Sequence, residues 1–359
     1  MQLNEHRLLI IASCFGIAAL ALVLGALFVG RLAPDDAADT TDVAIVDTDD
    51  AAAPEPETHV YVTTMTHMEG SFQDDTDEAL FLRHVAQMRW AMDLFDEYGM
   101  KLTFESEQSF AKANTTWGLN MLKEVVERGH GVGTHADFGA ESVAKSTAFY
   151  VRAFEENKAL VDALAGAEHN RGISGGIGAY DWATAMSRAG FSYVDGVVGF
   201  AYLAMPESER PDGWTDEYIR STAFHTPVPL DFSLRARFYE LTNADDFTPD
   251  GEGITISGGE TAEFSKLAED GDCRSCPVTT EDADAFFAWV REAEAVRTEY
   301  DEPTKVNVHI PLVLFTESNE AVLRYFLAGL EELVAEVPSI RLATQGEAYD
   351  GYLEWRSAR

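Results

Sequence analysis

The sequence predicts an α/β protein in which helices cover a largely parallel β-sheet. From Thr58 onward, short apolar runs of strand length alternate with segments of helix length, and this alternation is typical of parallel strands joined by crossover helices. The chain has 359 residues and is 46% hydrophobic, so it contains enough apolar side chains for a large buried core. An open doubly wound sheet and a closed barrel both fit the alternation.

The predicted elements follow one another along most of the chain. The predicted strands are residues 59–65, 101–104, 131–135, 171–174, 191–194, 236–241, 306–314 and 340–344. The predicted helices are residues 78–98, 116–128, 142–165, 181–189, 280–299 and 319–337. Gly99, Gly129 and Pro338 directly follow three of these helices, as expected for residues that end a helix. Residues 199–271 are rich in Pro, Gly and acidic side chains, and we expect loops and a few extra strands there.

Residues 1–31 are predicted to form an N-terminal transmembrane anchor. Leu8 to Gly30 is a run of 23 residues without a charged side chain, which is long enough to cross a bilayer as a single helix. A cleaved signal peptide has a shorter apolar region, so it is the second interpretation of this segment. Residues 32–57 contain Asp, Ala and Pro but no basic residue, which predicts a disordered acidic linker. Residues 58–359 then form the globular domain.

The charge of the chain restricts its partners. The formal net charge at pH 7 is −36, and binding to nucleic acid depends on Lys and Arg side chains that neutralise phosphates. We therefore expect no nucleic acid as a partner. Anionic lipid headgroups are disfavoured for the same reason, so the predicted contact with the membrane is made by the N-terminal helix alone.

Two short polar pairs at strand ends predict a metal site. His67 and Glu69 follow the first predicted strand, and His135 and Asp137 lie at the end of the third. Side chains two positions apart on a strand point to the same face, so each pair can present an imidazole and a carboxylate together. These groups are the usual ligands of Zn²⁺ other than thiolates, and in α/β sheets and barrels sites form where strands end. The alternative is that each pair is a polar strand end that faces water.

A longer segment that ends after His135 carries a recognisable motif. The stretch MKLTFESEQSF is followed by a helix that ends in LKEVVERGHGVGTHADFG. This order resembles the polysaccharide deacetylase family, the NodB-like carbohydrate esterases, whose second motif is GHEIGSHT. The resemblance implies that His135 binds a metal and that His130 is structural. It covers about residues 58–350 and implies a distorted (β/α) barrel of about seven parallel strands, from the superfamily of deacetylase and glycoside hydrolase barrels.

Three other segments are similar to motifs of the same family. THMEG at residues 66–70 stands where the family has Thr-Phe-Asp-Asp-Gly, so Glu69 matches the metal-binding carboxylate and Met68 stands in place of the catalytic base. Arg171 lies in a segment similar to the third motif, whose arginine orients catalytic carboxylates. His309 follows an apolar strand and is similar to the histidine of the fifth motif, which implies a general acid.

The ligand set departs from the family pattern. Gly139 stands where the second metal-binding histidine is expected. Asp137 is the natural substitute because it shares a strand face with His135, and Glu141 is also close enough in sequence to reach the site. His67 is a further candidate, as a fourth ligand. We expect a divalent cation, with zinc preferred for this set.

The catalytic base is also left open by the sequence. A thioether does not accept a proton near neutral pH, so Met68 cannot act as the base. Glu105, Glu107 and His67 are the candidates that lie within reach, and we assign the role first to Glu105. The alternative for Glu105 and Glu107 is that they form the polar face of a strand that leaves the barrel.

These inferences predict a metal-dependent hydrolase that removes acetyl groups from an N- or O-acetylated carbohydrate. Its metal ligands would be Glu69, His135, Asp137 and His67, with His309 as general acid. The protein would cross the membrane once, with its domain outside the cytoplasm, in the periplasm or the extracellular space. One alternative is a relative of the same fold that binds glycan without activity. Another is a glycosidase with paired carboxylates such as Glu69 and Asp137, because fold alone does not separate these activities.

Overall fold

A computed structural model of the chain describes most of the region predicted to be globular. The described residues are 57–68, 73–137, 145–249, 251–268 and 277–359. The predicted anchor, all of the predicted linker except its last residue, and Glu69, Gly139 and Glu141 lie outside this set. Within it, no helix combines the length and the apolar character needed to cross a membrane.

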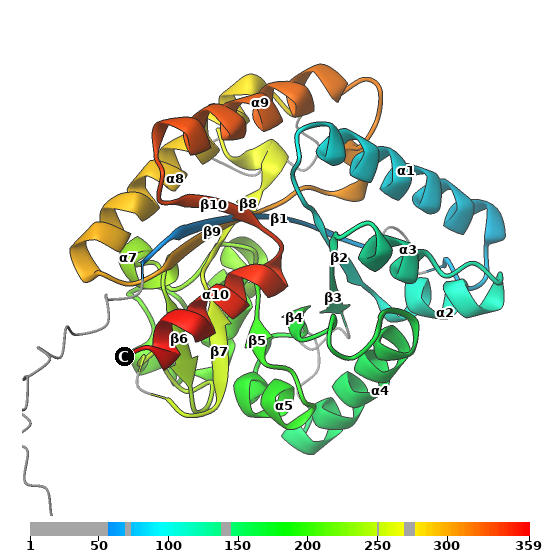
Figure 1. Ribbon diagram of the computed structural model, residues 1–359. Coiled ribbons are helices and arrows are strands. Elements are labelled where there is room, and N and C mark those ends of the chain that lie inside the picture. The colour runs from blue at the N-terminus through cyan, green and yellow to red at the C-terminus, as the bar shows by residue number, and fades with distance from the viewer. Residues whose placement is uncertain (1–56, 69–72, 138–144, 250, 269–276) are drawn as a thin grey trace, which may run out of the picture. The chain divides into compact units, whose positions relative to one another are not determined.

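The described residues form one curved, ten-stranded sheet surrounded by helices (Figure 1). The order of neighbouring strands is β6-β7-β5-β4-β3-β2-β1-β9-β8, and β10 also pairs with β1. All pairs are parallel except β6 with β7. The strands are β1 (Val60–His67), β2 (Thr103–Ser106), β3 (Gly131–Ala136), β4 (Gly172–Gly175), β5 (Tyr193–Val194), β6 (Phe238–Leu241), β7 (Ile254–Ser257), β8 (Glu260–Glu263), β9 (Thr304–His309) and β10 (Ile340–Ala343).

Helices lie around the outside of the sheet, as Figure 1 shows. They are α1 (Glu78–Glu97), α2 (Gln108–Thr116), α3 (Met121–Glu127), α4 (Thr147–Ala165), α5 (Trp182–Arg188), α6 (Asp216–Tyr218), α7 (Phe232–Arg235), α8 (Thr280–Tyr300), α9 (Glu320–Glu336) and α10 (Gln345–Ser357). Four of the longer helices, α1, α4, α8 and α10, begin at a residue whose side chain accepts a hydrogen bond from the first turn; Asp77, for example, accepts from the backbone N–H of Leu80 at the start of α1. Their apolar faces are buried against the strands in a large hydrophobic core.

The predicted parallel α/β architecture is therefore confirmed, as a half-barrel of parallel strands with more strands than the expected seven. The two ends of the sheet are connected by β7 and β8. β7 pairs with β5, while β8 pairs with β9 on the far side. Gly258, between these two strands, has a φ of +52°, and a Cβ there would lie 2.5 Å from Cβ of Lys305. A side chain is thus excluded where the segment passes from one end of the sheet to the other.

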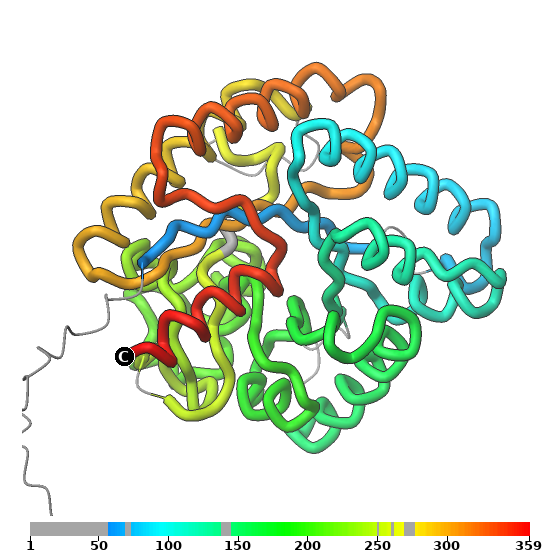
Figure 2. Tube along the Cα trace, viewed as in Figure 1, coloured from blue at the N-terminus to red at the C-terminus, as the bar shows by residue number. Residues whose placement is uncertain are grey.

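β1 lies in the middle of this arrangement, so the first strand contacts elements from both ends of the described chain. Residues 60–63 pair with β10, residues 65–67 pair with β2, and β9 pairs along the other edge of β1. The tube in Figure 2 shows the blue N-terminal strand beside the orange and red segments of the last strands.

The amino-terminal end of the barrel is covered by α10. This helix was not predicted, and it carries Tyr349 and Tyr352 against an aromatic cluster with Tyr61, Tyr193 and Phe238 from three strands. The rings of Phe238 and Tyr352 are stacked with centroids 4.9 Å apart. The end of the barrel opposite the strand termini at residues 67 and 309 is therefore closed by packed side chains.

The interior of the barrel is polar in part. Lys305 and Asp195 are both almost completely buried, and Lys305 Nζ lies 2.7 Å from Asp195 Oδ1 and 2.9 Å from the Ser257 hydroxyl. Burial raises the pKa of Asp195, and the adjacent Lys305 ammonium opposes that rise. Each charge is therefore stabilised inside the barrel by the other.

Two of the predicted elements differ clearly from the observed ones. The predicted helix at residues 116–128 corresponds to α3, which begins only at Met121: Thr116 is the last residue of α2, Gly118 takes a φ of +71°, and Asn120 caps α3. The predicted strand at residues 306–314 ends with β9 at His309, because Pro311 cannot donate a hydrogen bond to a neighbouring strand and a short 3₁₀ turn follows it.

Candidate metal centre and active site

Four neighbouring strands bring polar side chains to one end of the barrel. In the parallel registers, His67 on β1 lies opposite Glu105 on β2, and His135 on β3 lies opposite Ser174 on β4. Gly133 lies opposite Glu105, and a Cβ at this glycine would lie only 3.1 Å from Glu105 Cγ. The absence of a side chain at position 133 therefore leaves space for the Glu105 side chain.

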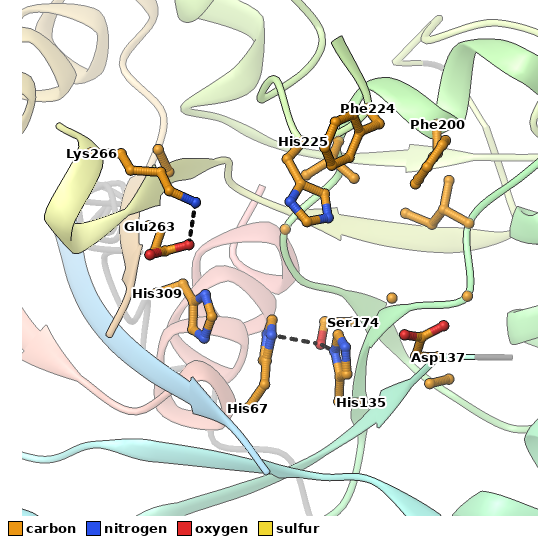
Figure 3. A pocket seen from close by; sticks show the side chains of 17 residues that line it. His67, His135, Asp137, Ser174, Phe200, Phe224, His225, Glu263, Lys266 and His309 are labelled. Atoms are coloured by element: carbon orange, nitrogen blue, oxygen red, sulfur yellow. Dashed lines mark hydrogen bonds and ion pairs between the residues drawn. The ribbon is translucent and has the colours of Figure 1, made fainter. Parts of the chain in front are cut away.

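These side chains contact one another directly, and Figure 3 shows three of them, His67, His135 and Ser174. His67 Nε2 lies 3.1 Å from Glu105 Oε2, and His135 Nδ1 lies 2.8 Å from the Ser174 hydroxyl. Ser174 also lies 3.4 Å from His67 Nε2 and donates a short hydrogen bond to Glu105 Oε2. One ligand atom from each of His67, Glu105 and His135 lies within 4.8 Å of the other two. The sequence predicted two of these three side chains as ligands, and Glu105 as a base.

The properties of this group fit a bound divalent cation. Glu105 is completely inaccessible to solvent, and its Oε1 atom makes no hydrogen bond with any described residue. A buried carboxylate oxygen without a partner carries a large desolvation cost, which a cation would offset. Two imidazoles and one carboxylate also form the three-ligand set of many catalytic zinc sites, which keep further positions for water or substrate.

A third histidine extends the group on the side of β9. The ring of His67 stacks on His135 with a centroid distance of 3.8 Å, and on His309 with a centroid distance of 4.0 Å. Figure 3 shows His67 between the other two rings. His309 therefore lies one ring away from the candidate ligands, which suits a residue that exchanges protons with a substrate rather than one that holds the cation.

All three histidines line a pocket of about 420 Å³. Ser174 and Asp137 line the same pocket close to the histidines, as Figure 3 shows. Its other walls are formed by an aromatic group and by an ion pair, which are Phe200, Phe224, His225, Glu263 and Lys266. The expectation that the site lies where parallel strands end is consistent with this position.

The structure places the remaining predicted residues differently. Asp137 follows β3 directly and is exposed on the pocket wall, but it does not belong to the group of three ligand atoms. Glu107 precedes α2 and is buried without lining the pocket. Met68 is completely buried in the apolar core, so it presents nothing to a substrate.

Arg171 is not brought together with the other predicted residues. It precedes β4, and its guanidinium forms a two-point ion pair with Asp350 of α10, at 2.6 and 2.8 Å, and also bonds to Gly346 O. These partners belong to the helix that closes the opposite end of the barrel. We therefore correct the interpretation of Arg171 as an orienting residue: its contacts are those of a structural tie between β4 and α10.

His130 has the structural environment that the resemblance implied. Its Nδ1 accepts a hydrogen bond from the backbone N–H of Leu102 at 3.1 Å, and its Nε2 lies 3.3 Å from Asp96 Oδ1. Burial lowers its pKa to about 4, so the neutral ring is favoured at neutral pH. The histidine thus links the loop after α3 to the start of β2.

Ser174, Glu263 and Lys266 were not recognised from the sequence. Ser174 could have been suspected from the register alone, because it lies opposite His135. Its contacts do not form the nucleophile arrangement of a serine hydrolase, in which an imidazole lies between the hydroxyl and the carboxylate. Here the Ser174 hydroxyl donates directly to Glu105. Ser174 is therefore assigned to orienting the carboxylate and the His135 ring.

Comparison with solved structures agrees with the fold predicted from the motifs. No protein-family model and no curated protein matches the sequence. A structure described as a polysaccharide deacetylase from Mycobacterium smegmatis is similar, with 14% identity, a TM-score of 0.53, and coverage of 85% of this chain and 93% of that chain. One described as a polysaccharide deacetylase from Pseudomonas aeruginosa PAO1 aligns at 10% identity and a TM-score of 0.48, over 83% of this chain and 92% of that chain. The first likeness shows that this chain has the fold of the polysaccharide deacetylases, as the motif resemblance implied.

Proposed function

We propose that the protein is a metal-dependent hydrolase that removes acetyl groups from an N- or O-acetylated carbohydrate. The observation that supports this most directly is the convergence of His67, Glu105 and His135 beside the pocket that His67, His135 and His309 line. The deacetylase fold is the context that favours a carbohydrate ester or amide over other substrates. The proposed ligand set replaces the predicted Glu69 and Asp137 with Glu105.

The candidate ligands would hold a divalent cation, preferably zinc, which would supply Lewis-acid activation of the acetyl carbonyl. Ser174 keeps Glu105 and His135 in place through its two contacts. Orientation of ligands by a second layer of hydrogen bonds usually has a large effect on metal affinity. In this proposal the chain itself supplies ligands, orientation and proton transfer.

His309 is the proposed general acid. It lies at the end of β9, lines the pocket and stacks on His67 at 4.0 Å. An imidazole at this position can deliver a proton from Nδ1 or Nε2 to the amine or alcohol that leaves. The stack limits rotation of its ring, so the proton would be presented in one direction.

Two carboxylates of the pocket wall are the proposed sources of the general base. Asp137 is exposed beside His135, and Glu263 lies opposite His309 in the register of β8 and β9. Both face the cavity, whereas Glu107 does not line it. This revises the sequence-based choice of Glu105, which is committed to the ligand group. Replacing Asp137 with Asn and Glu263 with Gln, one at a time, should identify the base as the variant that loses about 10²-fold in kcat with unchanged metal content.

The test of the proposed function uses the full-length protein, purified in detergent without chelator. We expect about one equivalent of zinc, cobalt, nickel or manganese by elemental analysis, and release of acetate from acetylated chitin-, peptidoglycan- or xylan-type oligosaccharides. His309→Gln should retain the metal and lose at least about 10²-fold in kcat. A protein that binds no metal, or one that produces new reducing ends without acetate, would contradict the proposal; the second outcome would favour a glycosidase.

The second candidate function is binding of glycan without catalysis. Met68 supports it, because the family base is replaced by a side chain that is completely buried in the core. Protein that is loaded with metal and binds acetylated oligosaccharides without releasing acetate would favour this function.

We further propose that residues 1–31 anchor the protein in a membrane, with the catalytic domain in the periplasm or the extracellular space. The run of 23 uncharged residues and the acidic segment after it support this. Release of the full-length protein from membranes by a carbonate wash would contradict an integral anchor.

A further inference from the structure

The candidate ligand His135 is held at its ring and at its backbone by different elements. The Ser174 hydroxyl lies 2.8 Å from His135 Nδ1. A Cβ at Gly175 would lie 2.8 Å from His135 Cε1, so the absence of a side chain at position 175 leaves space for the ring. Both of these contacts come from β4 and act on the imidazole. The backbone of His135 is held from the opposite direction along the chain, by helix α4.

Asn157 of α4 makes the contact to the backbone. Its Nδ2 donates a hydrogen bond to the carbonyl oxygen of His135 at 3.1 Å, and the residue is 1% exposed. The pairing of β2 with β3 extends to Ser106 and Thr134, one residue before His135. Asn157 therefore holds β3 just beyond the point at which its pairing with β2 stops.

Asn157 occupies a position that the pattern of α4 would give to an apolar side chain. The buried residues of this helix are Tyr150, Phe154, Asn157 and Val161, which follow one another at the spacing of a single helix face. Asn157 Oδ1 makes no hydrogen bond with any described residue. A buried amide oxygen without a partner costs free energy that a leucine at this position would avoid. The contact with His135 is thus the feature that distinguishes asparagine from an apolar residue here.

The residue before His135 is tied to the same helix. Thr134 Oγ1 donates to Asn170 Oδ1 at 2.9 Å, and Asn170 Nδ2 donates to Asp162 Oδ1 of α4 at 2.8 Å. Thr134 is therefore linked to α4 through an intermediate residue, whereas His135 is linked to it directly. Two successive residues at the end of β3 are fixed relative to one helix.

We propose that Asn157 is a positioning residue for the metal centre, because it fixes the backbone of His135 and thereby the place at which the imidazole meets the cation. This inference rests on the proposed function, since it concerns a ligand of the same site. The carbonyl carbon that Asn157 holds is bonded to the Cα that bears the ring, so a shift of one displaces the other. Ligands must be held within about 0.5 Å of the productive geometry.

The affinity of the full-length protein for zinc tests the inference. Asn157→Leu removes the amide and keeps a side chain of similar size. We expect its Kd for Zn²⁺, measured by competition with a chromophoric chelator, to rise about 10- to 100-fold, as is usual when a group that orients a ligand is lost. An unchanged Kd in the folded variant would overturn the proposal. Should the leucine variant fail to fold, Asn157→Ala provides the same comparison.

Asn114 of α2 is the matched control, because it is also a buried asparagine on a helix. It is 2% exposed, its Nδ2 donates to Phe110 O at 2.7 Å, and its Oδ1 accepts from the backbone N–H of Met121 at 2.6 Å. Two hydrogen bonds are lost in Asn114→Leu and one in Asn157→Leu. We therefore expect Asn114→Leu to lower the midpoint of denaturation in chelator more, and yet to leave the Kd for zinc unchanged. An equal rise of Kd in both variants would show that affinity follows stability alone, and would overturn the positioning role.

A measurement without metal separates failure of this inference from failure of the proposed function. The ¹⁵N shifts of histidine ring nitrogens, recorded by NMR in chelator, report the contact between the His135 ring and Ser174; the signal of His135 is the one lost in His135→Ala. We expect these shifts to change in Asn157→Leu and to stay the same in Asn114→Leu. If the wild type binds no metal, the deacetylase proposal fails, and the change of shift would still support the positioning role. Identical shifts in the wild type and Asn157→Leu would overturn it.

Discussion

Two carboxylates are buried in the same barrel, and their partners are of different kinds. Asp195, in the interior, lies 2.7 Å from the ammonium group of Lys305. Glu105, at the end of β2, lies against His67 and Ser174, and its Oε1 has no hydrogen bond among the described residues. The interior carboxylate is thus neutralised by the chain itself, whereas Glu105 belongs to a group of three side chains that could hold a metal ion. Burial of the acid is offset by a cationic side chain in the first case, and we propose that a bound cation offsets it in the second.

The largest effect is expected when the interior pair is broken. Lys305→Met would leave Asp195 as an uncompensated buried charge, and it should lower the free energy of unfolding by about 3–5 kcal/mol. Chemical denaturation of the variant and the wild type, both in chelator, measures this loss.

The double variant Lys305→Met, Asp195→Asn is the control for the interior pair. Because it removes both charges, it should recover part of the lost stability. If Lys305→Met alone were as stable as the wild type, Lys305 and Asp195 would not form an ion pair in the folded protein.

Removing the carboxylate of Glu105 should impair metal binding and activity but leave the stability of the fold almost unchanged. Glu105→Gln should lose the stoichiometric metal and at least about 10²-fold in acetate release, while its stability in chelator stays close to that of the wild type. Elemental analysis, acetate assays and denaturation curves check the three expectations. Glu107→Gln is a matched control two residues away, since Glu107 does not belong to the group of candidate ligands. Full metal occupancy in Glu105→Gln would remove Glu105 from the ligand set.

Metal removal should also distinguish the interior pair Lys305–Asp195 from the candidate metal ligands. A cation present at about 100 times its dissociation constant stabilises the folded state by about 2.7 kcal/mol. We therefore expect chelation to lower the Tm of the wild type and of Asp195→Asn, and to leave that of His135→Ala unchanged. Calorimetry with and without chelator measures this difference. A chelator effect of the same size in His135→Ala would place the cation elsewhere.

The smallest predicted effect concerns a buried histidine without a metal role. Burial holds the pKa of His130 at about 4, below the value of 6.5 for a free histidine. Its stabilising contribution is complete above pH 6.5 and is lost as the pH falls toward 4, so about 2 kcal/mol should disappear between pH 7 and 5. Denaturation curves across this range, compared with His130→Asn, isolate the contribution. An identical pH dependence in the two proteins would contradict it.

The sequence was sufficient to predict the parallel α/β fold because each strand and helix has its own local pattern. The strands that carry His67, His135 and His309 were all predicted, and their residues do meet in one pocket. The prediction of a barrel depended on the resemblance to the deacetylase motifs, because the alternation of strands and helices alone also fits an open sheet.

Glu105 was assigned a different role because register between parallel strands is not encoded locally. It lies on a strand of four residues, and its partner His67 is separated from it by the whole of α1. Only the paired sheet shows that the two side chains are adjacent and that Gly133 leaves room for the acid. Arg171 was assigned to the site because its partner could not be foreseen: Asp350 lies on α10, a helix that the sequence did not predict.

The position of β1 has a consequence for the synthesis of the protein. Val60, near the start of the domain, pairs with both Thr304 and Ile340, and α10 follows the second of these directly. Contacts between residues so distant in sequence slow folding, because the intervening chain must be closed into a loop first. Residues 65–67 of β1 can pair early with β2, but residues 60–63 have no partner strand until β9 and β10 are made. Until then its apolar edges are open to other chains, so this nascent protein should depend on chaperones for most of its translation.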